Sequence, residues 1–394
     1  MKLAAIATHP IQYQAPLWRI MAASRDIDLT VFFASRHGVE PSWDPGFGGT
    51  FAWDIPTTKG YPHEFLPAVT LPFLQGPVSN KYPKGLTRIL RSGDFDGILV
   101  HGYATGAAWA GILAGWRLEL PVLMQGDTHE HGRDLPPLKK RLKSLILKPL
   151  LKRIDGFRAI GTWNRNYWES YGVPEEKVAT SLYAVDNDFF QSQATQQADR
   201  TLKLRRKWDA KSDDVVYLFC AKLISVKAPE ALLDAFSLLG EPKARLVFVG
   251  TGALEGALKG RQEQLHVPHI YWEGFVNQSE LPAFYSAADV LVLPSRFEPW
   301  GLVVNEAMAC GTPCIVSDVV GAGPDLVDGK GTGLSFRHDQ PQALAEAMKT
   351  AMDPEVRREW QRNIPQVLAP ARLDQNLRDI QTLLQRILQG RAHR

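Results

Sequence analysis

Cysteine is scarce in this chain of 394 residues, which has three thiols, at Cys220, Cys310 and Cys314. Three thiols cannot build the disulfide framework of a small secreted domain. No second pair of Cys or His stands near Cys310 and Cys314 to complete a zinc site. We therefore expect packed thiols in a reducing compartment and no bound metal.

An excess of charge of one sign is also missing. Lys and Arg total 45 and Asp and Glu total 42, which gives a formal net charge of +3. This balance excludes a protein that seeks polyanions through its overall charge, so we expect no nucleic-acid partner, although a local basic patch is compatible with it. Disorder is excluded as well, because 17 Phe, 11 Trp and 10 Tyr supply many apolar side chains for a folded core.

The chain has no long run of strongly apolar residues. Its longest uncharged stretch, Gly97–Trp116, is long enough to cross a bilayer, but His101 and several Gly and Ala interrupt it. A strand followed by a helix of small residues fits this stretch better. The segment MKLAAIATHPIQYQ at the start is typical of a first strand and differs from a secretory signal. We therefore expect a cytoplasmic protein without a membrane-spanning segment.

Short apolar runs alternate with helical patterns along the whole chain. This alternation predicts βαβ units with parallel strands and right-handed crossovers. At about 150 residues per domain the length fits two domains, so we predict an α/β fold of two doubly wound, Rossmann-like domains. The first series of strands is expected at Leu3–Ala7, Leu29–Phe33, Gly97–His101, Val122–Gln125 and Gly156–Ile160, and the second at Val215–Cys220, Arg245–Val249, His269–Trp272, Val290–Leu293 and Pro313–Val316.

Two segments between the periodic stretches stand out by composition. The polar, weakly patterned QSQATQQADR, residues 191–200, is typical of a linker. We predict one domain over residues 1–192, a second over 193–365 and a C-terminal helix within 366–394. Residues 37–61 are rich in Gly, Pro, Trp and Asp and are too long for an ordinary connection. They form either a functional lid or a packed Ω-loop.

The most informative segment is SRFEPWGLVVNEAMACGTP, residues 295–313. It follows an apolar strand, so Glu298 lies beyond the carboxyl end of that strand, where open α/β sheets bind ligands. A helix that starts at Gly301 leaves its first amides without intrahelical partners, and such amides suit a phosphate or a dense set of hydroxyls. Carboxylates accept hydrogen bonds from vicinal hydroxyls. Glu306 follows about one turn into the helix. Two carboxylates around one junction of a turn and a helix indicate a ligand site.

The spacing Glu298-x7-Glu306 resembles the EX7E motif of retaining GT-B glycosyltransferases. The sequence around it, EPWGLVVNEAMACGTP, resembles glycosyltransferase family 4. The likeness continues in order through residues 219–236, 246–252, 270–276, 281–294 and 312–336. It implies the GT-B fold, in which two Rossmann-like domains face a cleft. It also implies transfer of a sugar from a nucleotide-sugar to an acceptor, with retention of the anomeric configuration.

The resemblance implies roles for residues of the C-terminal half. Glu298 and the helix amides would hold the donor sugar, and Glu306 would hold the nucleotide ribose. Lys227 matches a family Lys that binds the donor diphosphate. Lys222 stands where the family has Arg, and a lysine keeps the positive charge but lacks the bidentate fork of a guanidinium. The implied donor-binding residues are Lys222, Lys227, Gly252, Phe275, Glu298, Gly301, Leu302, Val303 and Glu306.

The N-terminal half resembles the family more loosely and would bind the acceptor. His9 and Gln12 follow the first strand and are expected at the acceptor, although His9 could instead cap a loop. Asp127 and His129 follow the strand at Val122–Gln125, in a bunch of polar side chains that is not expected in a core. Either of them would face the acceptor near the reacting carbon. The predicted catalytic residues are Asp127, His129, Glu298 and Lys227.

Residues 136–153, PPLKKRLKSLILKPLLKR, contain seven basic residues, no acid and interleaved leucines. A basic amphipathic helix of this kind can lie on an anionic bilayer, or it can be an ordinary crossover helix with a solvated basic face. Family members often act on lipid-linked acceptors. We therefore expect a lipid-linked or glycan acceptor, a place in polysaccharide biosynthesis, and peripheral contact through residues 138–153 at the inner face of the membrane.

Three other functions are compatible with parts of this pattern. A non-hydrolysing sugar-nucleotide epimerase shares the architecture but needs acid–base groups for which no motif stands out. A catalytically silent sugar-binding scaffold would not need Glu298 and both lysines. An NAD oxidoreductase would need a G-x-G-x-x-G after the first strand, which is missing. The resemblance implies a metal-independent hexosyltransferase without a cofactor, because Lys side chains and a helix N-terminus neutralise the leaving diphosphate.

Overall fold

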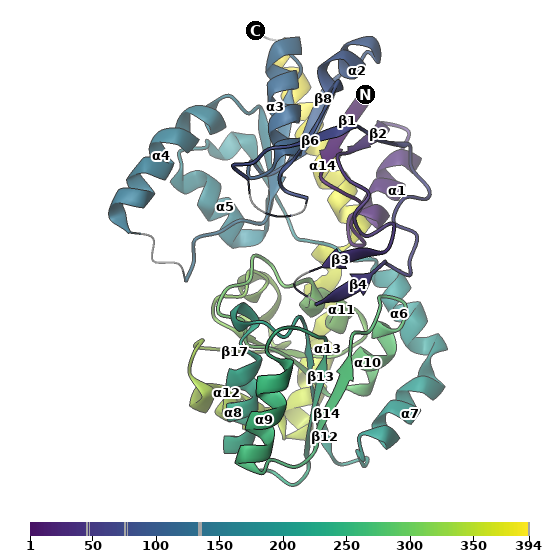
Figure 1. Ribbon diagram of the computed structural model, residues 1–394, viewed down its shortest axis with the longest axis vertical. Coiled ribbons are helices and arrows are strands. Elements are labelled where there is room, and N and C mark those ends of the chain that lie inside the picture. The colour runs from purple at the N-terminus through teal and green to yellow at the C-terminus, as the bar shows by residue number, and fades with distance from the viewer. Residues whose placement is uncertain (45, 47, 75, 77, 133–135, 393–394) are drawn as a thin grey trace.

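The computed structural model describes residues 1–44, 46, 48–74, 76, 78–132 and 136–392, and the side chains up to residue 390. Two α/β domains are stacked along the long axis of the molecule, with the N-terminal domain uppermost in Figure 1. Each domain contains a parallel sheet with helices on both faces. The GT-B architecture implied by the sequence has this arrangement.

Among the described residues, the N-terminal sheet has seven parallel strands in the order β11-β10-β9-β8-β1-β2-β5. The chain runs from β1 to β2 and β5, then returns to the other side of β1. The strands are β1 Lys2–Ala7, β2 Asp28–Phe33, β5 His63–Phe65, β8 Gly97–His101, β9 Val122–Gly126, β10 Gly156–Ile160 and β11 Val178–Ser181. The helices are α1 Ala15–Ala23, α2 Leu86–Ser92, α3 Gly106–Leu118, α4 Pro137–Lys152 and α5 Gly161–Ser170.

The described part of the C-terminal domain has six parallel strands in the order β14-β13-β12-β15-β16-β17. The direction of winding reverses between β12 and β15. The strands are β12 Val215–Cys220, β13 Ala244–Val249, β14 Ile270–Gly274, β15 Val290–Leu293, β16 Cys314–Ser317 and β17 Gly333–Phe336. The helices are α8 Pro229–Leu239, α9 Glu255–Leu265, α10 Leu281–Ala287, α11 Leu302–Ala309, α12 Pro341–Ala351 and α13 Pro354–Leu368.

The doubly wound α/β prediction is confirmed, and all ten predicted strands are present with ends shifted by two residues at most. Three strands of the two main sheets were not predicted: β5, β11 and β17. Each has three or four residues and includes exposed or half-buried side chains, so none shows the continuous apolar run of its neighbours. The three cysteines are free thiols, as expected.

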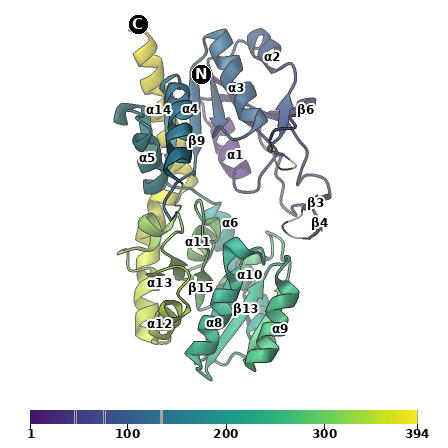
Figure 2. The ribbon, with the colours of Figure 1, turned by 60° about the vertical axis from the view of Figure 1, so that its left-hand side comes forward.

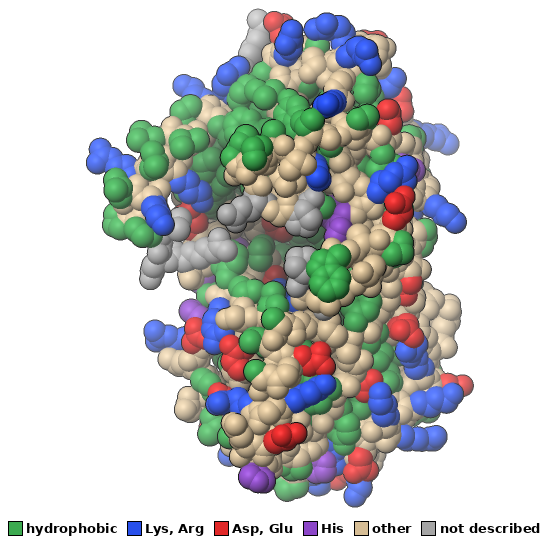
Figure 3. All heavy atoms as spheres, in the orientation of Figure 1, with side chains coloured by type: hydrophobic (Ala, Val, Ile, Leu, Met, Phe, Trp, Pro, Cys, Tyr) green, Lys and Arg blue, Asp and Glu red, His purple; other side chains and the backbone are tan. Residues whose placement is uncertain are grey.

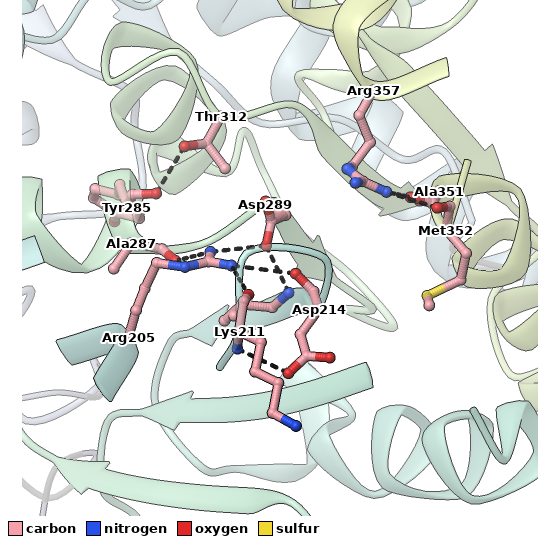
Figure 4. A network of polar contacts seen from close by, with 11 residues as sticks. Arg205, Lys211, Asp214, Tyr285, Ala287, Asp289, Thr312, Ala351, Met352 and Arg357 are labelled. Carbon is pink, nitrogen blue, oxygen red and sulfur yellow. Dashed lines mark hydrogen bonds and ion pairs between the residues drawn. The ribbon is translucent and has the colours of Figure 1, made fainter. Parts of the chain in front are cut away.

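The prediction of an unpatterned linker at residues 191–200 is wrong, because this segment is helical. It lies in α6, Asn187–Gln196, and α7, Ala198–Lys207. The α7 helix is fastened to the C-terminal domain by Arg205, whose guanidinium donates to the Ala287 carbonyl and to Asp289 Oδ2, both at 2.9 Å (Figure 4). The same guanidinium donates to the carbonyls of Lys211 and Asp214 at 3.2 Å. The contacts to Ala287 and Asp289 are distant in sequence, so the local polar composition did not reveal them.

The last helix, α14 (Leu373–Ala392), crosses from the C-terminal domain to the N-terminal sheet, as Figure 2 shows. Its apolar side chains Ile380, Leu383, Leu384 and Ile387 are buried with residues of β1 and α1. The buried Arg158 guanidinium of β10 donates to Asn376 of α14 and, at 3.1 Å, to Gln125 Oε1. This helix therefore links the C-terminal domain to the N-terminal domain.

Two small antiparallel hairpins leave the N-terminal domain outside its main sheet. One pairs β6, Ala68–Thr70, with β7, Lys81–Pro83. The other pairs β3, Ser42–Asp44, with β4, Gly49–Phe51, inside the Gly- and Trp-rich segment. Figure 1 shows β3 and β4 below the N-terminal sheet, beside the C-terminal domain. The hairpin of β3 and β4 thus lies between the N-terminal sheet and the C-terminal domain.

Candidate active site

A cavity of about 540 Å³ lies between the two domains, and Figure 3 shows the surface hollowed there. Residues of both domains line it. Ten of the thirteen predicted site residues are in the lining, namely His9, Gln12, Lys222, Lys227, Phe275, Glu298, Gly301, Leu302, Val303 and Glu306.

The cavity lies at the carboxyl ends of β12 and β15. The winding of the C-terminal sheet reverses between these neighbours, and open α/β sheets bind ligands at such a switch point. Lys222 follows β12 by two residues, and Glu298 follows β15 by five. The topology therefore places a cation and a carboxylate on opposite sides of the same crevice.

The N-terminus of α11 opens into the cavity. Gly301 precedes the helix with a φ of 96°, in the left-handed region that favours glycine. A Cβ at this position would stand 2.9 Å from Leu293 Cδ2 and 3.2 Å from Glu298 Cγ, so a larger residue would press on the acid. The amides of residues 301–303 belong to the first turn and have no intrahelical acceptor. They supply donors and a positive helix end to the cavity.

Glu298 and Lys227 contact each other within the cavity. The Lys227 ammonium, from the turn before α8, forms an ion pair with Glu298 Oε2. The Ser295 hydroxyl donates to the same oxygen at 3.3 Å. The Lys227 and Glu298 side chains are 22% and 10% exposed. The lysine predicted to bind the diphosphate and the carboxylate predicted to bind the donor sugar are therefore adjacent and partly buried.

Glu306 faces the cavity from α11 and is held by two side chains. Tyr285 Oη donates to Oε2 at 2.6 Å, and Gln278 Nε2 donates to Oε1 at 3.1 Å. Burial raises the pKa of the Glu306 carboxyl, while these two hydrogen bonds lower it. Tyr285 and Gln278 were not predicted from the sequence. Tyr285 lies in an apolar stretch of α10 that has the pattern of a core helix.

The N-terminal wall of the cavity contains aromatic and imidazole rings. The His9 and His37 rings lie 5.3 Å apart, edge to face. Burial, followed by the nearby His37, lowers the pKa of His9 to about 4, so His9 is neutral at neutral pH. Tyr13, Phe51 and Trp53 also line this wall and were not predicted. Phe51 and Trp53 lie in residues 37–61, where the unusual composition was the signal in the sequence, and Tyr13 directly follows the predicted Gln12.

Asp127 is not among the residues that line the cavity. Burial raises the pKa of its carboxyl, and the negative charge of Glu298 adds to the shift. The carboxyl also interacts electrostatically with Tyr13, which lines the cavity. The Asp127 carboxyl is therefore placed close to the groups on both sides of the cleft.

His129 and Gly252 also lie outside the lining, in contrast to the expected positions. His129 is 2% exposed, and its Nε2 donates to the Glu298 backbone carbonyl at 2.9 Å. Its ring packs against Trp163 and Phe297, so it fastens the N-terminal domain to the Glu298 loop instead of facing an acceptor. A Cβ on Gly252 would stand 2.5 Å from the Leu223 carbonyl oxygen. In the same turn, Gly250 contributes to the lining.

Two family models match the chain, one in each domain. Residues 13–181 match the glycosyl transferase 4-like domain, and residues 201–367 match glycosyl transferases group 1. The chain belongs to the group 1 glycosyltransferases. Both halves of the molecule are covered by these matches, so the resemblance seen in the sequence is confirmed.

Curated relatives of this group 1 glycosyltransferase match about half of the chain. An uncharacterized glycosyltransferase of Methanocaldococcus jannaschii is 35% identical over 177 residues, which cover 44% of this chain and 45% of that protein. A D-inositol 3-phosphate glycosyltransferase of Thermomonospora curvata is 30% identical over 207 residues, which cover 50% and 48%. The chain thus spans about half the length of the curated relatives it matches.

Solved structures match the group 1 glycosyltransferase over nearly its whole length. A glycosyltransferase of Rickettsia africae has a TM-score of 0.74 at 16% identity and covers 98% of both chains. Sucrose-phosphate synthase of Thermosynechococcus elongatus has a TM-score of 0.70 at 19% identity and covers 99% of this chain and 100% of that one. Anabaena HepE, solved with UDP, has a TM-score of 0.72 at 17% identity, over 98% and 99%. At these identities the likeness shows the fold alone, and it confirms GT-B.

Proposed function

We propose that this group 1 glycosyltransferase transfers a sugar from a nucleotide-sugar to an acceptor, with retention of the anomeric configuration. The observation that carries the proposal is the shared cavity, which brings Lys222, Lys227, Glu298, Glu306 and the open end of α11 together at a sheet switch point. A nucleotide-sugar has a matching order of groups, with hydroxyls on either side of a diphosphate. HepE, which shares the fold, has been solved with UDP and with UDP-glucose, and this supports a nucleotide-sugar donor.

In this proposal the diphosphate lies between Lys222, Lys227 and the first turn of α11. The two ammonium groups and the positive helix end neutralise the charge that develops on the leaving group. A side chain that supplies this charge makes a bound metal unnecessary, so we propose metal-independent transfer without a cofactor.

The remaining residues hold the other parts of the substrates. Glu306, positioned by Tyr285 and Gln278, accepts hydrogen bonds from the ribose hydroxyls. Glu298 and the amides of Gly301, Leu302 and Val303 bind the transferred sugar. The base lies beside Phe275 and the Gly-rich turn that contains Gly252. These contacts fix the donor in the C-terminal domain.

The acceptor approaches from the N-terminal wall. Neutral His9 and Gln12 offer hydrogen-bonding groups to acceptor hydroxyls. Asp127 acts near the reacting centre, which is supported by the electrostatic interactions of its carboxyl with Glu298 and Tyr13. His129 acts as a positioning residue, because it holds the backbone of Glu298.

The proposal is tested by transfer assays with UDP-, GDP-, ADP-, CDP- and dTDP-sugars in EDTA, with the product anomer identified by NMR. We expect one donor class to be used and an α-linked donor to give an α-linked product. Loss of transfer in EDTA would contradict metal independence, and an inverted anomer would contradict retention. Conversion of the free nucleotide-sugar into its epimer would favour the epimerase.

We also propose that the acceptor is a lipid-linked or other glycan in polysaccharide biosynthesis, and that α4 contacts the inner face of an anionic membrane. One side of α4 packs on the domain through Leu147, Leu150 and Leu151. The opposite side exposes apolar side chains next to basic ones, and a groove of about 650 Å³ beside it is lined by Lys140, Arg141 and Lys148. Figure 3 shows this mixture on the part that projects at the left. The exposed apolar side chains of α4 are Leu138, Leu142, Leu145 and Ile146.

An ordinary crossover helix does not require a second apolar side. A bilayer surface would cover the exposed apolar side of α4. In the described part of the chain, no helix has the length and apolarity needed to cross a bilayer. Contact through α4 would therefore be peripheral.

The double substitution Leu142→Ser and Ile146→Ser is expected to abolish flotation with vesicles that contain phosphatidylglycerol. Each basic residue near such a surface contributes about 1 kcal/mol, so high salt should also weaken binding of the unaltered protein. The matched control is Leu202→Ser with Leu238→Ser, which changes two apolar residues of similar exposure on other helices. Equal flotation of both variants, or binding that does not respond to salt, would leave α4 as a crossover helix.

A further inference from the structure

The hairpin of β3 and β4 carries an acidic side chain across the cleft to a lysine of the predicted donor site. Asp44 Oδ1 and Oδ2 lie 2.9 Å and 3.1 Å from Lys222 Nζ. The two side chains are 17% and 30% exposed, so the ion pair is partly shielded from water. Asp44 and Lys222 both line the cavity.

The hairpin turn fixes the direction of this carboxylate. The Gly46 amide donates to Asp44 Oδ1 at 2.7 Å. Lys222 packs closely on the same turn, because a Cβ on Gly46 would lie 2.6 Å from Lys222 Nζ. The hairpin backbone therefore holds the Asp44 carboxylate in place and packs against the Lys222 side chain.

Three further contacts fasten the same segment to the C-terminal domain. The Asn277 side-chain amide donates to the Ala52 carbonyl at 2.8 Å. The Ser279 amide donates to Asp54 Oδ1 at 3.2 Å, and its hydroxyl donates to Asp54 as well. The rings of Phe51 and Phe275 lie 5.9 Å apart. These contacts hold the segment beside the C-terminal domain, so the effective concentration of the Asp44 carboxylate near Lys222 is high.

We propose that Asp44 is an internal competitor of the donor, whose carboxylate occupies the position of a phosphate beside Lys222 until a nucleoside diphosphate displaces it. A carboxylate and a phosphate are both oxyanions that accept hydrogen bonds from an ammonium group. The proposal rests on the function proposed above, because it assigns Lys222 to the diphosphate.

Competition at Lys222 has a defined consequence for affinity. The free energy of the Asp44–Lys222 pair must be given up when a diphosphate binds, so the pair weakens donor binding by its own strength. Asp44→Asn removes the charge but keeps an oxygen for the Gly46 amide. We expect this variant to bind the nucleoside diphosphate about fivefold more tightly, which corresponds to about 1 kcal/mol for one partly exposed ion pair.

The test is calorimetric titration with the nucleoside diphosphate, among UDP, GDP, ADP, CDP and dTDP, that stabilises the protein. The matched control is Glu40→Gln, which removes one negative charge from the same segment at an exposed pair with Arg36. We expect no change in affinity for this control. In a Lys222→Ala background, where binding is already weak, Asp44→Asn should add nothing, because the two effects act through one contact.

Failure of this proposal is distinguishable from failure of the proposed function. Affinity of Asp44→Asn that equals or falls below that of the unaltered protein would overturn the competition, while weaker binding by Lys222→Ala would keep Lys222 at the diphosphate. Unchanged binding by Lys222→Ala would overturn both assignments of that lysine. If no nucleoside diphosphate bound either the unaltered protein or Asp44→Asn, the proposed function would fail and the competition with it.

Discussion

Replacement of Lys227 by alanine is expected to slow sugar transfer by about a hundredfold to a thousandfold. A leaving nucleoside diphosphate gains negative charge as the glycosidic bond breaks. A cation fixed beside it stabilises the transition state more than the ground state, and this difference raises the rate. The measurement is the turnover number at saturating donor, for the nucleotide-sugar that the protein uses.

The structure also predicts an effect of this substitution on stability. A lysine on a solvated rim would contribute little to folding, but Lys227 is paired with Glu298, whose side chain is 10% exposed. Removal of the ammonium leaves that carboxylate partly buried without its cation, so a lower Tm is expected. Transfer must therefore be measured well below the Tm of the variant. Lys227→Arg, which keeps the charge, should retain more activity than Lys227→Ala.

A matched control separates the local effect from a general loss of charge. Lys243 pairs with Asp213 on the surface of the same domain, and both side chains are well exposed. Lys243→Ala should therefore leave both transfer and Tm nearly unchanged. Lys222→Arg should be tolerated, because it restores the residue of the family pattern. Near-full transfer by Lys227→Ala would show that the diphosphate does not lie beside this lysine.

Glu306→Ala is expected to weaken nucleoside diphosphate binding by about tenfold to a hundredfold, because hydrogen bonds to a charged group contribute about 1.5–3 kcal/mol. In the proposed function these hydrogen bonds come from the ribose hydroxyls. Calorimetry measures the loss. Glu306→Gln keeps the shape of the side chain and one oxygen for Tyr285. Its affinity for the nucleoside diphosphate should lie between that of the unaltered protein and that of Glu306→Ala.

A 2′-deoxy nucleoside diphosphate gives the matched test for Glu306. The unaltered protein should prefer the ribose form, and Glu306→Ala should bind both forms alike, since the partner of the 2′-hydroxyl is gone. The two groups left behind, Tyr285 and Gln278, are buried, so the Tm of each variant serves as the control for folding. Unchanged affinity in Glu306→Ala would remove this residue from the site.

The main sheets could be predicted because their signal is local. Strands such as Val215–Cys220 and Val290–Leu293 are buried on both faces and appear as continuous apolar runs. Lys222 and Glu298 follow such strands by two and five residues, so the topology of an open α/β sheet was sufficient to bring them to one crevice. The short strand β5, with two exposed residues of three, gave no such signal.

The rest of the site depends on contacts that local patterns do not contain. Asp44 meets Lys222 across 178 positions of sequence, and no spacing rule connects them. Asp127 and His129 both follow β9, and counting along the chain could not tell which ring or carboxyl turns toward the cleft. The structure turns His129 to the Glu298 backbone. The long-range partners of Arg205 likewise explain why a polar segment forms helices.

In the proposed function, the interdomain cavity binds a nucleoside diphosphate through Lys227 and Glu306. This binding is tested most directly by the thermal stability of the protein with UDP, GDP, ADP, CDP and dTDP in EDTA. A ligand at a hundred times its dissociation constant should add about 2.7 kcal/mol to the free energy of unfolding. We expect one of the five to raise the Tm of the unaltered protein and to leave the Tm of the double variant Lys227→Ala with Glu306→Ala unchanged. Stabilisation by none of them, or equal stabilisation of the double variant, would contradict the proposed binding.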